Sequence, residues 1–486
     1  MNSSAPTFLW HDYETFGLDM RIDRPAQFAA VRTDLALQPV AEPVVLHCRL
    51  SDDCLPQPRS CLITGITPQR CDELGVDEAR FARALQSELA SANSCIVGYN
   101  NLRFDDGFTR HLFYRNFLDP YAHEWQQGNS RWDLIDLVRM TYALRPDGID
   151  WPLHEDGTPS FRLEDLTRAN QIAHADAHDA LADVEATLAV ARLIKARQPR
   201  LFDYSYRMRD KREVARLIDL RQPTPVLHVS GRFPAAHGHT AIVLPLARHA
   251  TNANAVICFD LSEDPAPLLE CSVEEIRQRL FSSREQLEQQ GQRRIPLKLI
   301  HLNRCPAIAP LKLLTPQLAE RLQIDRARCE RHWQNFPAVA ALTDKLQQIF
   351  GEPPAQGEPD VEQALYTGSF WSEPDRRLMQ QLQQEEPTRL ASYAGRFADP
   401  RLPELLFRYR ARNHPHTLSE SEQTRWQQWR RQRLLEGGPG LLTLAQFFAQ
   451  IDQLAVSGEI RSERDRAVLV QLRQHGERLA RMVEAA

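Results

Sequence analysis

The spacing of apolar and polar positions predicts an α/β domain in the first part of the chain. Four short apolar runs have the length of buried strands, and two longer segments have helical spacing. The runs lie at residues 7–13, 27–33, 44–49 and 94–98, and the helical segments at 77–89 and 177–196. Strands separated by helices are typical of a mixed α/β sheet.

The pattern changes after a break at residues 197–200. Short runs rich in β-branched residues follow at 226–229, 240–244, 255–260 and 297–301. Between them, Ser272 and Glu275 form a capping-box pattern that predicts a helix running toward Gln290. This region is predicted to be a small β-rich barrel with inserted helices.

A proline- and glycine-rich segment at 351–359 predicts a linker, and the chain after it has helical patterns. One helix is expected to start at Ser372, and others at 423–435 and 443–456. A chain of 486 residues is also too long for one ordinary core. We therefore predict three domains, at residues 1–197, 198–354 and 355–486.

Composition is that of a globular protein, with 42% hydrophobic and 25% charged residues. No apolar run of about 18 residues and no signal-peptide pattern is present, so neither a membrane span nor secretion is expected. The nine cysteines contain no CxxC pair, which favours reduced thiols in a cytoplasmic protein. Nothing suggests more than a monomer. The net charge of −5 argues mildly against nucleic-acid binding, although a local basic groove is compatible with it.

The first candidate site is the acidic pair Asp12 and Glu14, which follows an apolar run. Residues two apart in a strand share one face, and two neighbouring carboxylates repel each other unless a cation lies between them. Mg²⁺ is such a cation, because it prefers oxygen ligands. The alternative is an exposed edge strand whose acids face water.

Two further segments add acidic residues. Asp105 and Asp106 follow the predicted strand at 94–98, and either one could reach a metal held by the first strand or simply cap a helix. Asp183 lies on a helix of small and apolar residues, five positions after His178. A carboxylate there needs a partner, whereas a histidine at a helix start is often only a solvated or capping residue.

The order D-x-E, Asp and H-x4-D is typical of DEDDh exonucleases, which have an RNase H-like fold. Several longer strings resemble the bacterial exonuclease I family. They lie at residues 8–17, 23–30, 62–68, 98–106, 129–134, 159–164, 228–231 and 407–413.

The resemblance implies an RNase H-like α/β exonuclease domain, an SH3-like β-rich domain and an α-helical C-terminal domain. It implies hydrolysis of single-stranded DNA from the 3′ end, releasing 5′-mononucleotides, in repair, recombination and mismatch excision. Two Mg²⁺ ions are expected, for which Mn²⁺ can substitute. The implied ligands are Asp12, Glu14, Asp105 and Asp183, with His178 as general base.

The family pattern thus selects Asp105 over Asp106. In the mechanism that it implies, Asp12 bridges both ions. Glu14 and Asp183 lie on the side of the attacking water, and Asp105 lies on the side of the leaving group.

Aromatic residues alternate with arginines between residues 103 and 145, as in channels that bind single strands. About half of these should be core, including Phe113, Phe117 and Trp132. The candidates for contact with DNA are Arg110, Tyr121, Trp125 and Arg139, and more weakly Asn254, Lys298 and His301. The resemblance adds Arg162 and Glu14 as substrate contacts. It also implies a pocket for the acidic tail of single-strand-binding protein, at Arg145 and Tyr204.

Two other functions are compatible with parts of the pattern. An RNA-trimming or proofreading DEDDh nuclease is usually one compact domain, so the additional ~290 residues disfavour it. A DNA-binding scaffold with an inactive nuclease fold would have lost a ligand, and all five positions are present.

Overall fold

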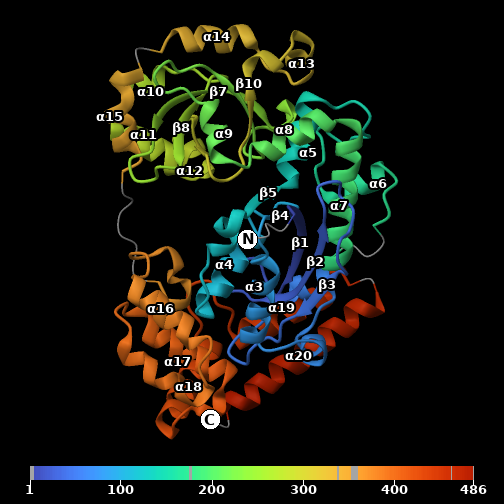
Figure 1. Ribbon diagram of the computed structural model, residues 1–486, viewed down its shortest axis with the longest axis vertical. Coiled ribbons are helices and arrows are strands. Elements are labelled where there is room, and N and C mark those ends of the chain that lie inside the picture. Colours follow the sequence, from blue (N-terminus) through green and yellow to red (C-terminus); the bar gives the residue numbers. More distant parts are fainter. Residues whose placement is uncertain (1–4, 175–177, 337–338, 352–358, 461, 485–486) are drawn as a thin grey trace. The chain divides into compact units, whose positions relative to one another are not determined.

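The structure is a computed structural model that describes residues 5–174, 178–336, 339–351, 359–460 and 462–484 (Figure 1). The predicted boundary at 355 and most of the predicted linker at 351–359 lie outside these ranges. The chain forms two compact units. Unit 1 comprises residues 1–129, 175–185 and 357–486, and unit 2 comprises residues 130–174 and 186–356.

The sheet of unit 1 places the acidic pair on an interior strand. Its strands follow the order β3-β2-β1-β4, with β1 antiparallel to β2 and parallel to β4. The strands are β1 (Thr7–Thr15), β2 (Pro25–Thr33), β3 (Val44–His47) and β4 (Ser94–Gly98). β1 is paired with β2 along its length and with β4 over residues 7–10, and Glu14 is buried, so the alternative of an exposed edge strand whose acids face water is wrong.

Helices α3 (Glu78–Leu89) and α4 (Asp105–Arg115) supply the core on one face of this sheet. Asp77 caps α3 by accepting the Arg80 N–H, and the apolar positions of the helix then repeat at helical spacing. Phe81 and Leu112 share one buried cluster with Leu9 of β1 and Phe28 of β2. This packing holds the first residues of α4 beside the end of β1.

The C-terminal helices belong to unit 1 as well. They are α16 (Glu373–Leu382), α17 (Arg401–Asn413), α18 (Glu420–Leu435), α19 (Leu444–Val456) and α20 (Glu463–Glu484). Phe16, which follows β1, and Ala26, near the start of β2, share a core with Phe447 of α19 and Leu472 of α20. Helices α1 (Pro58–Thr64) and α2 (Pro68–Leu74) complete this layer. Helices α19 and α20 therefore pack against the end of the unit 1 sheet where β1 ends and β2 begins.

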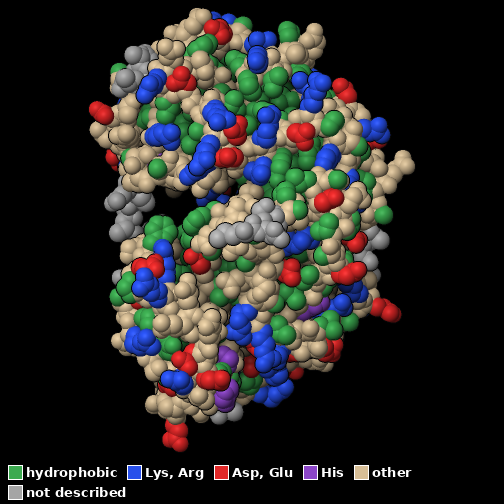
Figure 2. All heavy atoms as spheres, viewed as in Figure 1, with side chains coloured by type: hydrophobic (Ala, Val, Ile, Leu, Met, Phe, Trp, Pro, Cys, Tyr) green, Lys and Arg blue, Asp and Glu red, His purple; other side chains and the backbone are tan. Residues whose placement is uncertain are grey.

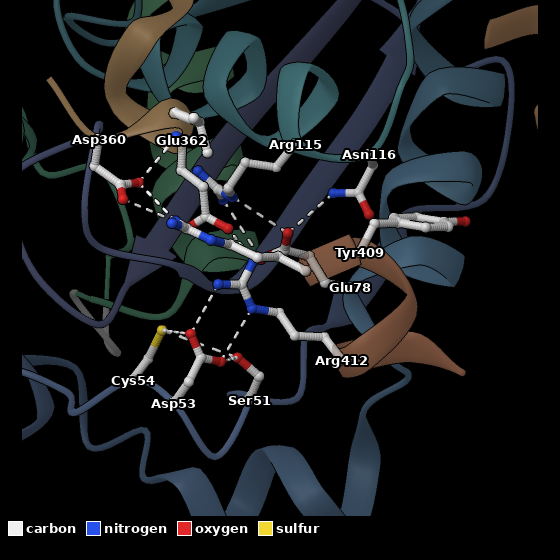
Figure 3. A network of polar contacts seen from close by, with 12 residues as sticks. Ser51, Asp53, Cys54, Glu78, Arg115, Asn116, Asp360, Glu362, Tyr409 and Arg412 are labelled. Atoms are coloured by element: carbon white, nitrogen blue, oxygen red, sulfur yellow. Dashed lines mark hydrogen bonds and ion pairs between the residues drawn. The ribbon is translucent and has the colours of Figure 1, made fainter. Parts of the chain in front are cut away.

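A buried network of charges also connects residues of the first and last segments of unit 1 (Figure 3). Arginines and carboxylates alternate within it, and Arg433 lies at its margin, 3.8 Å from Asp53. Its members are Arg24, Asp53, Glu78, Arg115, Glu362 and Arg412.

Arg412 is the centre of this network. It binds Asp53 through two nitrogens, at 3.0 and 2.8 Å, and it also contacts Glu362. Glu362 in turn accepts a hydrogen bond from Arg24 at 2.9 Å. Residues near the start of the chain and residues near its end thus neutralise one another inside unit 1.

Unit 2 contains the predicted β-rich region. Its antiparallel sheet has the order β10-β6-β7-β8-β9. The strands are β6 (Val226–Val229), β7 (Thr240–Arg248), β8 (Ala255–Asp260), β9 (Leu297–His301) and β10 (Ala307–Pro310). The remaining strand and helices before this sheet are β5 (Ser130–Asp133), α5 (Leu134–Leu144), α6 (Leu163–Ala169), most of α7 (Ala180–Arg197), α8 (Pro199–Arg207) and α9 (Lys211–Arg216).

The single helix predicted from Ser272 toward Gln290 is wrong. The segment forms two helices, α11 (Val273–Phe281) and α12 (Arg284–Gln289). The reason is a second capping box, in which Ser283 and Gln286 satisfy each other's backbone N–H groups and start a new helix. The other helices of this region are α10 (Ala266–Glu270), α13 (Pro316–Arg321), α14 (Arg326–Gln334) and α15 (Thr343–Ile349).

Among the described residues, no helix is both long enough and apolar enough to cross a bilayer. The cysteines form no disulfide in this part of the chain. Figure 2 shows Lys and Arg side chains interspersed with Asp and Glu over the visible surface of unit 2. The negative net charge is therefore compatible with basic groups on that surface.

Candidate active site

The acidic pair occupies the carboxyl-terminal half of β1. Asp12 is paired with Ala29 and Glu14 with Gln27 of β2, so both side chains are on the same face of the sheet. Asp12 is half-buried and Glu14 is buried. Two carboxylates that share a face in a largely water-excluded position strongly favour a cation between them.

Asp105 and Asp106 open α4, and both are buried. They differ in their surroundings. The carboxylate of Asp105 acts electrostatically on Asp12 and Glu14, and its buried Oδ1 has no hydrogen-bond partner among the described residues. Asp106 accepts a hydrogen bond from Asn101 and acts on His11 instead. Asp105 is thus the residue of the pair that faces the β1 carboxylates.

His178 and Asp183 come from the start of α7. His178 precedes the helix and has a left-handed backbone, with φ of 72°. Asp183 lies in the first turn. One ligand atom each from Glu14, His178 and Asp183 lie within 4.8 Å of one another. All five predicted catalytic residues belong to unit 1.

The protonation of these carboxyls reflects their crowding. Burial raises the pKa of Glu14 to about 9, and the charges of Asp183, Asp105 and Asp179 contribute. Burial and the neighbouring carboxylates, Asp105 first, also raise the pKa of Asp12 well above its ordinary value. Burial raises the pKa of Asp105 to about 7. A divalent cation would relieve this repulsion, and a set of carboxylate oxygens suits a hard ion.

We expect the metal-free protein to lose stability as Glu14 is forced to ionise. Its folded pKa of about 9 exceeds the ordinary value of 4.5, so its contribution is fully present below pH 4.5 and is lost as the pH rises toward 9. Thermal melting in EDTA should therefore show that the melting temperature of Glu14→Gln increases relative to that of the wild type as the pH rises, by roughly 5 °C or more. Saturating Mg²⁺ should raise the melting temperature of the wild type.

The control for this experiment is Glu185→Gln, which removes an exposed carboxylate from α7. It should follow the wild type at every pH. A constant difference between Glu14→Gln and the wild type from pH 5 to pH 9 would contradict the prediction.

Three predicted DNA contacts lie in unit 1 around α4. Arg110 forms an ion pair with Glu124 at 2.6 Å and lies over the ring of Tyr121 at 5.4 Å from its centroid. It also donates to the hydroxyl of Tyr366 at 3.3 Å. Trp125 is 65% exposed, which leaves its ring accessible to a base. Arg110 is held by protein partners, whereas Trp125 projects into solvent.

The aromatic residues that we expected to be core are indeed buried. Phe113, Phe117 and Trp132 have exposures of 1%, 2% and 2%. The prediction that the aromatic–arginine segment mixes core and surface residues is confirmed.

Four predicted contacts lie in the first half of unit 2. Arg139 pairs with Asp136 at 3.0 Å, and Tyr204 donates to the carbonyl of Ile308 at 2.8 Å. Arg145 follows α5, Arg162 precedes α6, and both are exposed. The guanidinium of Arg145 donates to the carbonyl of Leu144 at 2.5 Å, whereas Arg139 is held on its own helix by Asp136.

The three weaker candidates lie on or next to the sheet of unit 2. Lys298 donates to the carbonyl of Arg232 at 3.1 Å and lies 3.7 Å from the ring centroid of Phe233. Burial lowers the pKa of Lys298 to about 8 and that of His301 to about 4. Asn254 precedes β8 and is half-buried.

Two residues around the site were not predicted. Gln27 contacts the segment after His178, and Asp179 contributes to the field at Glu14. The sequence contains a signal for Gln27, because a single amide in the apolar run of β2 needs a polar partner when it is buried. Asp179 carries the signal of a helix N-cap, and it accepts the N–H groups of Leu181 and Ala182.

Three family models match the chain in succession. An exonuclease model matches residues 9–191, the exonuclease I SH3-like domain matches 209–352, and the exonuclease I C-terminal domain matches 359–479. These matches confirm the predicted fold classes and their order.

Characterised proteins and solved structures agree with these models. The exodeoxyribonuclease I of Escherichia coli strain K12 is 49% identical over 88% of this chain and 89% of its own length. The structure of a moderately thermophilic exonuclease I from Methylocaldum szegediense is 47% identical, covering 98% of this chain and 100% of that one, with a TM-score of 0.91. E. coli exonuclease I in complex with a dA16 oligonucleotide also has a TM-score of 0.91, at 46% identity and the same coverage.

Two further similar structures contain other bound species. One is the zinc-bound form of an E. coli exonuclease I–single-stranded DNA complex, with 45% identity and a TM-score of 0.90. The other is a complex of exonuclease I with SSB-Ct, with the same identity and TM-score. Each covers 98% of this chain.

Proposed function

This chain belongs to the bacterial exonuclease I family, and on that premise we propose that it hydrolyses single-stranded DNA from the 3′ end to 5′-mononucleotides. The observation that carries the proposal is the cluster of Glu14, His178 and Asp183 within 4.8 Å, beside the carboxylates of Asp12 and Asp105. This arrangement suits metal-dependent hydrolysis of a phosphodiester.

Asp12, Glu14, Asp105 and Asp183 would hold two divalent ions, for which we propose Mg²⁺, with Mn²⁺ as a substitute. The unpartnered Oδ1 of Asp105 and the raised pKa values of the carboxyls fit such ions. When bound, ions of this kind acidify water and stabilise charge on phosphate oxygens. Zinc in a related structure supports a divalent ion.

The protein's own groups have two tasks in this reaction. The imidazole of His178 accepts a proton from the attacking water and so acts as the general base. The carboxylates orient that water. They also repel the phosphate of the substrate unless cations are present, so the phosphate and the metal ions bind together.

DNA contacts are proposed at Glu14, Arg110, Tyr121, Trp125, Arg139, Arg162, Asn254, Lys298 and His301. The exposed ring of Trp125 supports base stacking, and the exposed guanidinium of Arg162 supports a contact with a phosphate. Arg145 and Tyr204 are proposed to bind the C-terminal tail of single-strand-binding protein, in keeping with the related SSB-Ct complex. We further propose domain boundaries near 197 and 355, a monomeric state, a cytoplasmic location and a role in repair, recombination and mismatch excision.

Digestion of end-labelled substrates tests the proposed activity. A single strand labelled at its 3′ end should release labelled mononucleotide at once, whereas a 5′ label should remain on a shortening ladder. Duplex DNA and RNA should be degraded much more slowly, and EDTA should abolish all hydrolysis until Mg²⁺ is restored. Early release of the 5′ label, or activity that persists in EDTA, would contradict the proposal.

A further inference from the structure

Gln27 connects the catalytic strand to the segment that follows His178. It lies on β2 directly opposite Glu14, and its side chain is 3% exposed. Its Nε2 donates to Oδ2 of Asp179 at 3.2 Å, and its Oε1 accepts the N–H of Ala180 at 3.2 Å. Both partners, Asp179 and Ala180, directly follow His178 in the chain.

The chemistry of the two partners fixes the orientation of this amide. The N–H of Ala180 can only donate, so it requires the amide oxygen, and a carboxylate can only accept, so it requires the amide nitrogen. A flipped amide would lose both hydrogen bonds. A side-chain amide carries both a donor and an acceptor, so it satisfies both partners at once without a net charge.

The backbone of His178 explains why such a clamp matters. With φ of 72°, His178 adopts a left-handed conformation that side-chain-bearing residues rarely occupy. Asp179 then caps α7, because its Oδ1 accepts the N–H groups of Leu181 and Ala182 at 3.1 and 3.3 Å. Gln27 holds this cap through the other oxygen of the same carboxylate.

We infer that Gln27 is a positioning residue, which acts through the backbone of residues 178–180 to hold the imidazole of His178 against Glu14 and Asp183. The inference rests on the proposed role of His178 as general base. It assigns to β2 a part in catalysis, although no β2 side chain belongs to the set of carboxylates and imidazole.

Gln27→Met tests the inference, because it keeps the length of the side chain and removes both hydrogen bonds. We expect kcat on single-stranded DNA to fall about 10- to 100-fold, the usual cost of losing a partner that orients a site residue. The KM for DNA and the Mg²⁺ concentration at half-maximal rate should stay within about twofold, because the carboxylates remain in place. A rise in the half-maximal Mg²⁺ concentration that accounts for the loss would overturn the inference.

A double-mutant cycle with His178→Ala separates positioning from a general structural effect. If Gln27 acts through the imidazole, Gln27→Met should change the rate of His178→Ala less than twofold. If the losses of kcat caused by the two substitutions multiply in the double variant, the inference is overturned and the proposed function is left intact. An unchanged rate in His178→Ala alone would instead contradict the assignment of the base.

Thr33→Val is the matched control. Thr33 is also a buried polar residue of β2, and it accepts a hydrogen bond from Nε1 of Trp10 at 3.0 Å, six residues along the strand from Gln27. This variant should lose stability but keep kcat. Gln27→Glu replaces Gln27→Met if the latter does not fold. Its carboxylate would repel Asp179, so we expect the same loss of kcat. In the His178→Ala background, it should again change the rate less than twofold.

Discussion

Asp183→Asn is expected to reduce hydrolysis of single-stranded DNA by on the order of 10⁴-fold, a loss typical of removing an essential carboxylate. Asp183 lies within 4.8 Å of Glu14 and His178, so the amide would remove a negative charge from the centre of the proposed metal site. Single-turnover digestion of a 3′-labelled strand at saturating Mg²⁺ measures this effect.

Binding should behave differently from hydrolysis in this variant. The proposed contacts along the strand, away from the metal site, remain in this variant, so the affinity for DNA should change far less than the rate of hydrolysis. Glu185→Gln is the control, because Glu185 is exposed on the same helix two residues later. It should retain full activity. Asp183→Asn with the activity of the wild type would show that the catalytic assignment is wrong.

Arg412→Met is expected to have the largest effect on stability, about 3–5 kcal/mol in the free energy of unfolding. The substitution leaves the buried carboxylates of Asp53 and Glu362 without the cation that binds both. Urea denaturation followed by linear extrapolation measures the loss. Arg473→Met, which breaks an exposed ion pair with Asp452, should cost less than about 1 kcal/mol.

The same network predicts sensitivity to acid. Although burial opposes it, Arg412 holds the pKa of Asp53 and of Glu362 below the ordinary range. Depressed values mean that their contribution is present above about pH 4 and is lost as the pH falls below it. The difference in stability between wild type and Arg412→Met should therefore shrink in acid. A difference that does not change from pH 7 to pH 3 would contradict this account.

Local patterns predicted much of the fold and one part of the site. The apolar run before Asp12 predicted β1, and alternation along a strand then fixed the common face of Asp12 and Glu14. Spacing could not choose between Asp105 and Asp106, because consecutive residues at a helix start point about 100° apart and the docking of the helix decides which one faces inward. The family resemblance selected Asp105, which is the residue that acts on the β1 carboxylates.

Other features depend on contacts between distant segments and could not be predicted locally. The two residues after His178 are bound by Gln27, which lies about 150 residues earlier in the chain. Nothing near Phe16 indicates that it packs with Phe447. The break between α11 and α12 is different, because Ser283 and Gln286 form a capping box that is visible in the local sequence.

The shared core of Phe16 and Phe447 has a consequence for biosynthesis. The strand that bears Asp12 and Glu14 is translated well before residues 357–486, which complete its unit. At typical translation rates of about 5–20 residues per second, roughly 10–50 s pass between the synthesis of residue 129 and that of residue 357. A nascent chain that has not yet reached these residues lacks the C-terminal helices and the Arg412 network, so unit 1 gains its full stability only after they are translated.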